Sequence, residues 1–490
     1  MTTNNILDLN PKLLWKWFNT ICSIPHPSYH DQALVNYIVN WAQQQNLDVS
    51  TDKAGNVLIR KAASPGYENV PCLALQAHSD MVPQANSDKQ HDFLVDPIVP
   101  VINGDFLYAD NTTLGADNGI GLASALAVLE DPNLKHGPIE VLVTRTEEVG
   151  MEGAINLAND WLTAEYMINT DTEEWGELYL GCAGGSDLTF TKELNFKPLK
   201  ENAKVVKLSL TGFRGGHSGC DIHTNRENAI KCLSKLLYAM YREVKFNFID
   251  LYAGQARNAI PREAYATVMV TEQNYQRFLE AYQANTAKLL SIYGLAEPDG
   301  KFILEEQAAD NQRRLSCSDM PNLLRFLVLV PNGILRQSDE FANTVESSLS
   351  GGILRLNPTD GFKYKILARS TVDTANALFG NEMYALADLT CLTLTISGTY
   401  SGWRPETSDF TKFVEKVYNQ HNQQQVAVKV IHAGLECGII KGHYPNMQLV
   451  SIGPDIFNPH TPKEHCRISS VEKYYNLIVD LIQNFKELDK

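Results

Sequence analysis

Histidine and carboxylate residues recur in this sequence directly after segments that are typical of buried strands. They are His78 and Asp80 after CLALQA (72–77), Asp117 at the start of an expected helix, Glu147 and Glu148 after IEVLVTR (139–145), Asp171 after YMINT (166–170), and His460 in the loop after QLVSIGP (448–454). Carboxylates that converge at one end of a sheet repel one another unless a cation compensates them. Imidazole and carboxylate groups both bind zinc and similar divalent metals. The pattern therefore predicts a metal site.

The number and spacing of these residues predict hydrolytic chemistry with two metals. One tetrahedral zinc would not need so many ligands, whereas two ions about 3.5–4 Å apart that share a bridging carboxylate are a recurring hydrolytic arrangement. His78 and Asp80 are two residues apart, so on an extended segment they face the same way and Asp80 can fix the tautomer of His78. Glu147 and Glu148 are adjacent and point in different directions. One can therefore bind metal while the other acts as a general base.

Each motif taken alone has a simpler interpretation. An isolated His-x-Asp or Glu-Glu pair is typical of a solvated loop. Asp117 by itself would be a good helix cap. The joint occurrence of these residues at successive strand ends is what favours a functional site.

The elements that must position these residues alternate between strands and helices. Helices are expected over 11–20, 31–46 and 117–130, with buried strands over 72–77, 139–145 and 166–170. This order predicts an α/β domain with a largely parallel sheet. In such sheets ligands bind beyond the carboxyl ends of the strands, where the candidate residues lie.

The pattern changes after GCAGGSD (181–187) and returns after SGTYSGWRP (397–405), where VAVKVIHAG (426–434) and QLVSIGP are expected as buried strands. Between them, a β-α-β-β-α order occurs twice, first from about residue 204 and again from KFILEEQ (301–307). We expect an α/β domain of residues 1–185 and 401–490, split by an inserted α+β domain over 186–400. The inserted domain is of ordinary domain size and has the layout of an internal duplication.

Composition and charge narrow the function classes. The chain has 490 residues, too many for one ordinary core, and a formal net charge of −15. That charge argues against nucleic-acid and anionic-membrane partners, because both require a basic surface. We see neither a secretory signal nor an apolar run near the ~20 residues of a membrane span, and the nine cysteines are an odd number without Cys-x-x-Cys. A cytoplasmic protein with reduced, mostly buried thiols is expected.

Five motifs resemble the signature set of the M20 metallopeptidase family, in its order: LQAHSDMV, GADNGIGLASALA, TRTEEVGMEGA, INTD and NPHTPKEH. TGFRGGHSG (211–219) resembles the family's lid motif, and the match runs along the whole chain. The resemblance implies a zinc-peptidase-like catalytic domain with a mostly parallel central sheet. The inserted domain would be its lid.

The resemblance also implies roles for the candidate residues. His78 and His460 are similar to ligands of different metals, Asp117 to the bridging carboxylate, and Glu148 and Asp171 to the remaining ligands, one on each metal. Asp80 matches the residue that orients the first histidine, and Glu147 matches the general base. Two divalent ions are implied, zinc first, with manganese or cobalt as alternatives.

Four further residues resemble the family's substrate contacts. His217 is similar to the lid histidine that polarises the scissile carbonyl. Asn258 in ARNAIP and Arg369 in ILARSTVD resemble residues that hold the substrate backbone and carboxylate, for which arginine is well suited. Glu436 in GLECG resembles a residue that meets the free amino terminus. Alternatively, Arg369 is a solvated charge.

The long lid and the segments LGCAGG, ARNAIP and GLECG resemble the members of the family that cleave dipeptides with free termini, Xaa-His dipeptides included. The implied reaction is hydrolysis by a metal-bridged water that Glu147 activates. One alternative is a deacylase of N-acyl amino acids, whose substrate would offer no ammonium to Glu436. A non-catalytic binding protein is another, although Glu147 is retained. Dinucleotide binding through LGCAGGSD is disfavoured because its glycines do not follow G-x-G-x-x-G.

The oligomeric state follows less directly from the sequence. A homodimer with two-fold symmetry is the commonest assembly. Simple relatives supply the lid histidine across a dimer interface, whereas a doubled lid could place His217 in the same chain as the metal ligands.

Overall fold

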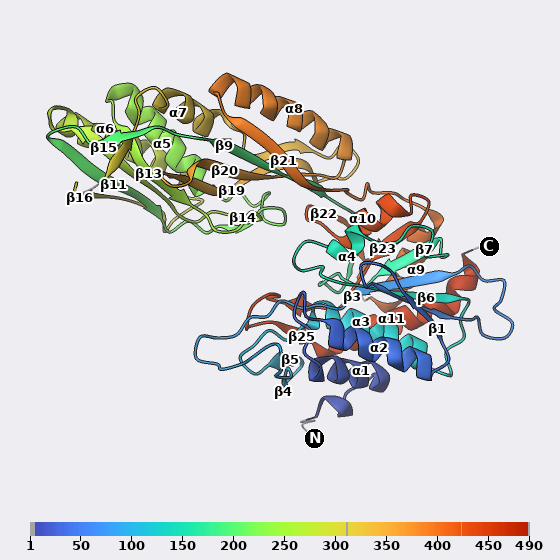
Figure 1. Ribbon diagram of the computed structural model, residues 1–490. Coiled ribbons are helices and arrows are strands. Elements are labelled where there is room, and N and C mark those ends of the chain that lie inside the picture. Colours follow the sequence, from blue (N-terminus) through green and yellow to red (C-terminus); the bar gives the residue numbers. More distant parts are fainter. Residues whose placement is uncertain (1–4, 310–311, 423, 489–490) are drawn as a thin grey trace. The chain divides into compact units, whose positions relative to one another are not determined.

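The computed structural model describes residues 5–309, 312–422 and 424–488, which form two compact units. Unit 1 comprises Met1–Cys182, Trp403–Val430 and Leu435–Lys490, and unit 2 comprises Ala183–Gly402 and Ile431–Gly434 (Figure 1). The segment Ile431–Gly434 therefore packs with unit 2, whereas the sequence analysis assigns it to the α/β domain.

Unit 1 is built on an eight-stranded sheet. Its strands, in spatial order, are β1 (Asp48–Thr51), β2 (Val57–Lys61), β6 (Ile139–Thr144), β3 (Leu73–His78), β7 (Tyr166–Asn169), β23 (Gln448–Ser451), β8 (Glu177–Cys182) and β22 (Ala427–Ile431). The α/β class predicted from the sequence is confirmed. The sheet is mixed, however: the central strands β6, β3, β7 and β23 run parallel. β1 pairs antiparallel with β2, β2 with β6, and β8 with β23.

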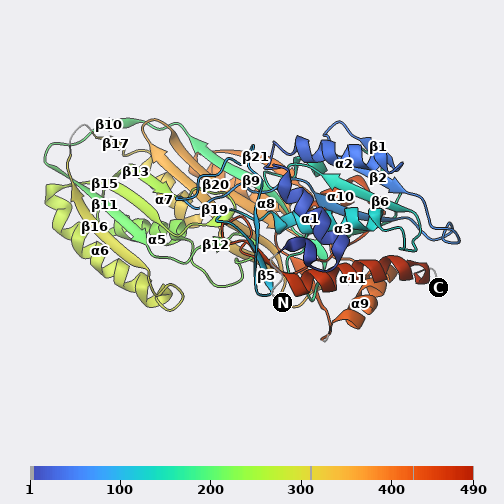
Figure 2. The same ribbon diagram turned by 90° about the horizontal axis from the view of Figure 1, so that it is seen from below.

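Helices cover the sheet of unit 1. They are α1 (Lys12–Ser23), α2 (Gln32–Gln44), α3 (Ala116–Glu130), α4 (Glu152–Ile155), α9 (Asp409–His421), α10 (Glu436–His443) and α11 (Ile468–Asn484), with 3-10 turns η1 (Ile6–Asp8) and η2 (Phe485–Glu487). β3 and β6 are buried along their whole lengths, as their continuous apolar sequences predict. Alternate residues such as Leu75 and Val141 pack into one core with α1, α3 and α11. Figure 2 shows α9 beside α11, which it contacts.

A second, four-stranded sheet in unit 1 frames the loops of the candidate site. Its order is β24 (Ile456–Phe457), β25 (His465–Arg467), β5 (Phe106–Ala109) and β4 (Pro100–Asn103). The antiparallel pair β24–β25 closes the loop that carries His460. β25 also pairs with β5, which precedes α3 in the chain.

Two predictions within unit 1 are wrong. VAVKVIHAG is not a buried strand, because β22 lies at the sheet edge and its first three residues are exposed. The helix expected over 117–130 is confirmed as α3, but its opening at Asp117 is not, because α3 begins at Ala116 and both Asp117 and Asn118 have non-helical backbone angles.

Unit 2 contains a nine-stranded antiparallel sheet covered on one face by helices (Figure 1). The strands are β16 (Lys301–Gln307), β11 (Ala203–Thr211), β15 (Ala264–Thr271), β13 (Asn247–Ala253), β19 (Val345–Asn357), β20 (Gly361–Ser370), β9 (Gly184–Lys192) and β21 (Thr393–Tyr400), with β18 (Gly333–Gln337) beside β19. The helices are α5 (Ala229–Glu243), α6 (Glu272–Tyr293), α7 (Met320–Leu329) and α8 (Asp373–Thr390). Two short pairs complete the unit: β10 (Phe196–Pro198) with β17 (Arg313–Leu315), and β12 (Gly216–His217) with β14 (Ala259–Ile260).

The nine-stranded sheet has two halves with the same topology. The chain order β11-α5-β13-β15-α6-β16 gives the spatial order β16-β11-β15-β13, and β9-α7-β19-β20-α8-β21 gives the same order read from the other edge. The halves join where β13 pairs with β19. The second repeat therefore starts with β9, and not with KFILEEQ as predicted, because β16 pairs with β11 and completes the first half.

None of the helices within the described ranges is long and apolar enough to cross a membrane.

Candidate metal centre

The central strands of unit 1 deliver the predicted ligands to one edge of the sheet. β3 ends at His78, β6 ends three residues before Glu147, and β7 ends two residues before Asp171. These strands pair in parallel, so their carboxyl ends meet at the same edge. β23 also runs parallel, and the chain beyond it leads through β24 to His460. The prediction that these side chains converge is thus supported by the pairing of the strands.

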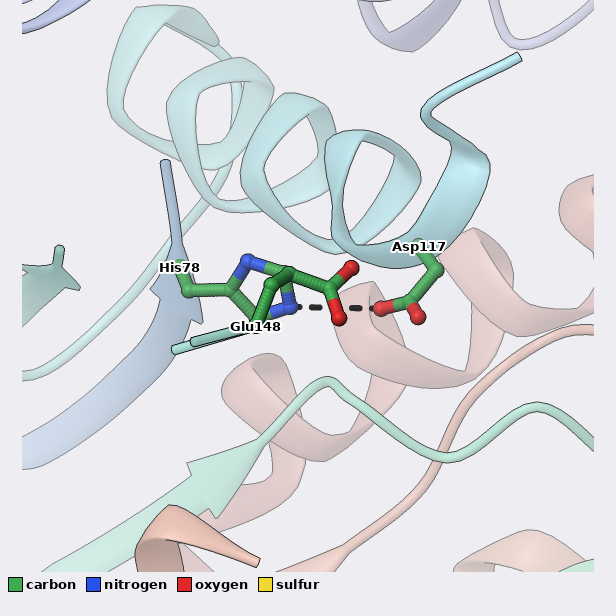
Figure 3. A group of neighbouring side chains, drawn as sticks. All are labelled: His78, Asp117 and Glu148. Atoms are coloured by element: carbon green, nitrogen blue, oxygen red, sulfur yellow. Dashed lines mark hydrogen bonds and ion pairs between the residues drawn. The ribbon is translucent and has the colours of Figure 1, made fainter. Parts of the chain in front are cut away.

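Asp117 lies between the two histidines and presents a different oxygen to each. Its Oδ1 is 3.2 Å from Nε2 of His78, a contact drawn in Figure 3, and its Oδ2 is 3.1 Å from Nε2 of His460. The non-helical backbone of Asp117 places the carboxylate at the start of α3. This is the arrangement that a carboxylate bridging two ligand groups requires.

The other two carboxylates each accompany one histidine. Asp171 Oδ1 is 3.4 Å from Nε2 of His78, and Glu148 Oε2 is 2.9 Å from Nε2 of His460. Ligand atoms of His78, Asp117 and Glu148 all lie within 4.8 Å of one another, so the two groups adjoin (Figure 3). The second oxygen of Glu148 is buried without a hydrogen-bond partner. Two imidazoles and three carboxylates, one of them with an unpartnered buried oxygen, fit a pair of divalent cations.

The crowding of charge perturbs the pKa of every member of the group. Burial lowers the pKa of both histidines, but the carboxylates outweigh it: the pKa of His78 lies well above its usual value, and that of His460 is raised to about 11. Burial raises the pKa of Asp117, yet His460 and His78 hold it below its usual range. Burial raises the pKa of Glu148 to about 7, with Asp117 adding to the effect. Positive charge on the imidazoles and negative charge on the carboxylates therefore favour each other, and divalent cations would compensate the same carboxylates.

Asp80 contacts both His78 and the loop that follows β6. Its main-chain oxygen accepts from Nδ1 of His78 at 2.9 Å, and its Oδ1 is 3.5 Å from the same nitrogen. Its carboxylate also accepts from the amides of Glu147 and Glu148 and from Ser28 Oγ. The sequence predicts only the contact with the histidine. Asp80 also holds the Glu147–Glu148 loop.

Glu147 and Glu436 are two further carboxyl groups in this part of unit 1. Burial raises the pKa of Glu147 well above its usual value, against the opposing effect of His78. Glu436 opens α10 and is fully buried, and burial raises its pKa to about 7. Its Oε2 accepts from Gln76 and Thr144, and its Oε1 has no hydrogen-bond partner. The role of Glu436 at a substrate amino terminus stays a prediction, and its complete burial does not favour that role.

Two of the predicted substrate contacts adjoin each other in unit 2. His217 Nδ1 accepts from the amide of Cys220 at 3.0 Å, so a neutral His217 ring carries its proton on Nε2. That nitrogen lies 3.4 Å from Nη2 of Arg369. Arg369 is 4% exposed, and among the described residues no carboxylate pairs with it. A guanidinium and an imidazole that lie side by side suit a negatively charged oxygen.

The remaining residues around Arg369 include one predicted and two unpredicted positions. Asn258 is exposed, and its main-chain oxygen accepts from the amide of Ser218, next to His217. Tyr400 Oη accepts from Arg369 Nη1 at 3.2 Å. His432 contacts Ser348 Oγ at 2.7 Å, and burial together with the Arg369 charge lowers its pKa to about 3. His432 therefore stays neutral. Tyr400 lies in SGTYSGWRP and His432 in VAVKVIHAG, segments whose pattern predicts a return to the α/β domain but no contact with Arg369.

Unit 1 also holds three polar residues that the sequence analysis missed. Asn118 donates to Asp171 Oδ1 at 2.5 Å. Burial, together with Asp117 and Asp171, raises the pKa of Glu173 well above its usual value. Glu464 is 2% exposed and accepts from the main chain before Asp117. Of the three, only Glu464 carried a usable signal, as a carboxylate in the same loop as His460.

Comparison with known proteins agrees with this geometry. The model of peptidase family M20/M25/M40 matches residues 74–484. The chain is 42% identical over 482 residues to cytosol non-specific dipeptidase of Escherichia coli (strain K12), which covers 98% of this chain and 99% of that protein. The crystal structure of aminoacylhistidine dipeptidase from Vibrio alginolyticus superposes with a TM-score of 0.86 at 42% identity, covering 98% of each chain.

A more distant structure shares the fold alone: human carnosine dipeptidase 1 matches with a TM-score of 0.51 at 12% identity, over 97% of each chain. The resemblance drawn from the sequence motifs is confirmed. The chain belongs to peptidase family M20/M25/M40.

Proposed function

We propose that this chain is a metal-dependent dipeptidase that hydrolyses dipeptides with free termini, Xaa-His dipeptides among them. The observation that carries the proposal is Asp117, whose two oxygens face two different histidines, each accompanied by a further carboxylate. The names of the relatives with 42% identity, a non-specific dipeptidase and an aminoacylhistidine dipeptidase, support the choice of substrate.

The chain would hold two divalent cations, with zinc as our first choice and manganese or cobalt as alternatives. His78, Asp171 and one oxygen of Asp117 would hold the first, and His460, Glu148 and the other oxygen of Asp117 the second. Bound there, two divalent cations would polarise a peptide carbonyl, lower the pKa of an intervening water and favour the ionised form of Glu147.

Glu147 is the proposed general base and acid. It would take a proton from the attacking water and return it to the nitrogen of the leaving amino acid. Its position next to the ligand Glu148, on a loop whose amides Asp80 holds, supports this role. Asp80 would in addition keep the proton of His78 on Nδ1 and leave Nε2 available as a ligand.

His217, Asn258 and Arg369 are the proposed substrate contacts. The Nε2 proton of His217 suits a hydrogen bond to the scissile carbonyl oxygen, which gains negative charge during attack. Arg369, buried and without a carboxylate partner in the described part of unit 2, suits the free carboxylate of a dipeptide. Asn258 adjoins His217 through the amide of Ser218 and would hold the substrate backbone.

We also propose that the chain works in the cytoplasm, without nucleic acid, and assembles as a homodimer. The name of the E. coli relative supports the location, and the formal charge of −15 disfavours nucleic acid. Size-exclusion chromatography with light scattering would test the dimer.

The function is tested by stripping metal from the protein and restoring zinc, manganese or cobalt one at a time. Each form is offered Xaa-His dipeptides, other dipeptides, tripeptides and N-acetyl amino acids. We expect metal-dependent cleavage of the dipeptides. Cleavage confined to the acetylated substrates would replace the proposal with an amidohydrolase, and full activity without metal would overturn it.

A further inference from the structure

The buried carboxylate of Glu464 occupies the amino end of α3. Its Oε2 accepts from the amides of Leu114 at 2.8 Å and Gly115 at 3.1 Å. Its Oε1 accepts from the amides of Ala116 at 2.7 Å and Asp117 at 3.4 Å. One side chain thus binds four consecutive main-chain N–H groups, the last of which belongs to the proposed bridging residue.

The local backbone explains why these four N–H groups converge. Gly115 has left-handed angles, φ 68° and ψ 30°, and a turn of this kind makes successive amides point into one concave site for an anion. The first amides of a helix also lack partners within the helix. Among the described residues, no lysine, arginine or histidine forms an ion pair with Glu464. The main chain at residues 114–117 is therefore what compensates its charge.

Glu464 joins the segment that carries Asp117 to the segment that carries His460. It lies four residues after His460 in the β24–β25 loop, and its amide donates to Thr461 to form a turn within that loop. Its carboxylate binds the segment that ends at Asp117. The distance of 3.1 Å between His460 Nε2 and Asp117 Oδ2 spans the same two segments.

We propose that Glu464 is a positioning residue that presets the separation of Asp117 and His460 for metal binding. It does not touch the metal or the substrate, but sets where the shared carboxylate stands relative to its second histidine. This inference rests on the proposed function, since it assumes that the group binds metal.

If Glu464 only stabilised the fold, its loss would lower stability without a specific effect on metal binding. Glu140 provides the matched control for this case. Glu140 is 1% exposed and accepts from the amides of Thr163 and Ala164 and from Arg60 Nε. It lies near the amino end of β6, whereas the metal ligands lie beyond the carboxyl ends of the strands. Loss of either buried carboxylate would cost stability. Only Glu464 is expected to affect the metal.

The test compares the full-length wild type, E464Q, E464D and E140Q, each stripped of metal and titrated with Co²⁺. Binding is measured by equilibrium dialysis and the ligand field by visible absorption, so neither readout depends on activity. E464Q keeps the size of the side chain but turns an NH₂ group towards amide donors, and E464D keeps the charge but is too short to reach all four amides. We expect Co²⁺ to bind 10- to 100-fold more weakly in both, with an altered spectrum, as is typical when the partner of a ligand is lost.

E140Q is expected to bind Co²⁺ with the affinity and spectrum of the wild type. E464Q or E464D that folds and matches the wild type in both readouts would overturn the positioning role alone. A comparable loss of affinity in E140Q would also overturn it, because the effect would then follow from stability. Wild-type protein that binds no Co²⁺ would overturn the proposed function, and this inference with it.

Discussion

Glu147 and Glu148 are neighbours in the chain, yet only Glu148 lies within ion-pair distance of a histidine in the metal group. Glu147 to Gln should therefore lower the turnover rate by 10²-fold or more, as is typical when a general base is lost. The metal content should stay the same. Glu148 to Gln is the matched variant and should lower the metal content. Rates and metal analysis on the same preparations decide between the two roles. Activity retained in E147Q would contradict the proposal.

Glu436 gives a pH-dependent prediction for the metal-free protein. Its pKa is about 7 in the folded chain against an ordinary value of 4.5, so the folded state holds the proton more tightly. The stability linked to this proton is fully present below pH 4.5 and is lost as the pH rises through 7. Between pH 5 and 8 the loss is on the order of a few kcal/mol.

Glu436 to Gln removes this titration. The free energy of unfolding of E436Q, relative to wild type, should therefore increase between pH 5 and pH 8, measured by urea titration. If the difference in unfolding free energy between E436Q and wild type does not vary with pH, the carboxyl group is ionised to the same extent in the folded and unfolded states. Turnover of E436Q on dipeptides, compared with N-acetyl amino acids, tests the predicted contact with the amino terminus separately.

At the scale of elements, the loop after β12 makes a close approach that only glycine allows. A Cβ on Gly219 would lie 2.1 Å from the main-chain oxygen of His432 and 3.2 Å from Nε of Arg369. Gly219 to Ala should therefore displace the His217 loop and lower kcat/KM by about 10²-fold, the usual cost of an ångström-scale misplacement. Metal affinity should not change, because the ligands belong to unit 1.

Gly380 to Ala is the control within unit 2. Its Cβ would meet only Cδ1 of Ile396, the end of a flexible side chain, at 3.1 Å. Kinetics and Co²⁺ binding of both variants check the prediction. Wild-type turnover in G219A would mean that the His217 loop tolerates displacement, and would argue against a role for His217 at the reacting carbonyl.

The sequence predicts those parts of the fold in which local pattern and packing agree. β3 and β6 are recognisable as continuous apolar runs, and α1 is recognisable from the helical spacing of its apolar residues. The same strands locate His78 and Glu148, since the carboxyl ends of parallel strands share one edge of a sheet. The roles of individual residues, such as general base or bridging carboxylate, are predicted from the family motifs and not from the hydrophobic pattern.

Other features depend on pairing over long distances and have no local signal. β9 follows a glycine-rich segment and forms a strand because β20 and β21 flank it, nearly 200 residues later in the chain. Tyr400 comes close to Arg369 through the same pairing. Glu464 binds amides some 350 residues away. Such contacts arise from tertiary structure, so propensity and spacing do not predict them.

At the scale of the whole molecule, the two units can be followed separately by spectroscopy. All six tryptophans of the sequence, Trp15, Trp17, Trp41, Trp161, Trp175 and Trp403, belong to unit 1. Tryptophan fluorescence therefore reports the unfolding of the unit that carries the proposed metal ligands. Far-UV circular dichroism reports both units, since each contains helices and strands.

Metal binding should stabilise unit 1 selectively, because a ligand that binds only the folded state adds its binding free energy to stability. In urea, metal at 1,000 times its dissociation constant should raise the free energy of the tryptophan-detected transition by about 4 kcal/mol. The shift should vanish in Asp117 to Asn, which removes the shared charge, and persist in Glu147 to Gln, which removes no ligand. A chelator should reverse it. If E147Q lost the stabilisation as D117N does, Glu147 would be a metal ligand and not a base. If metal did not stabilise the wild type, the proximity of the carboxylates at the strand ends would need another explanation.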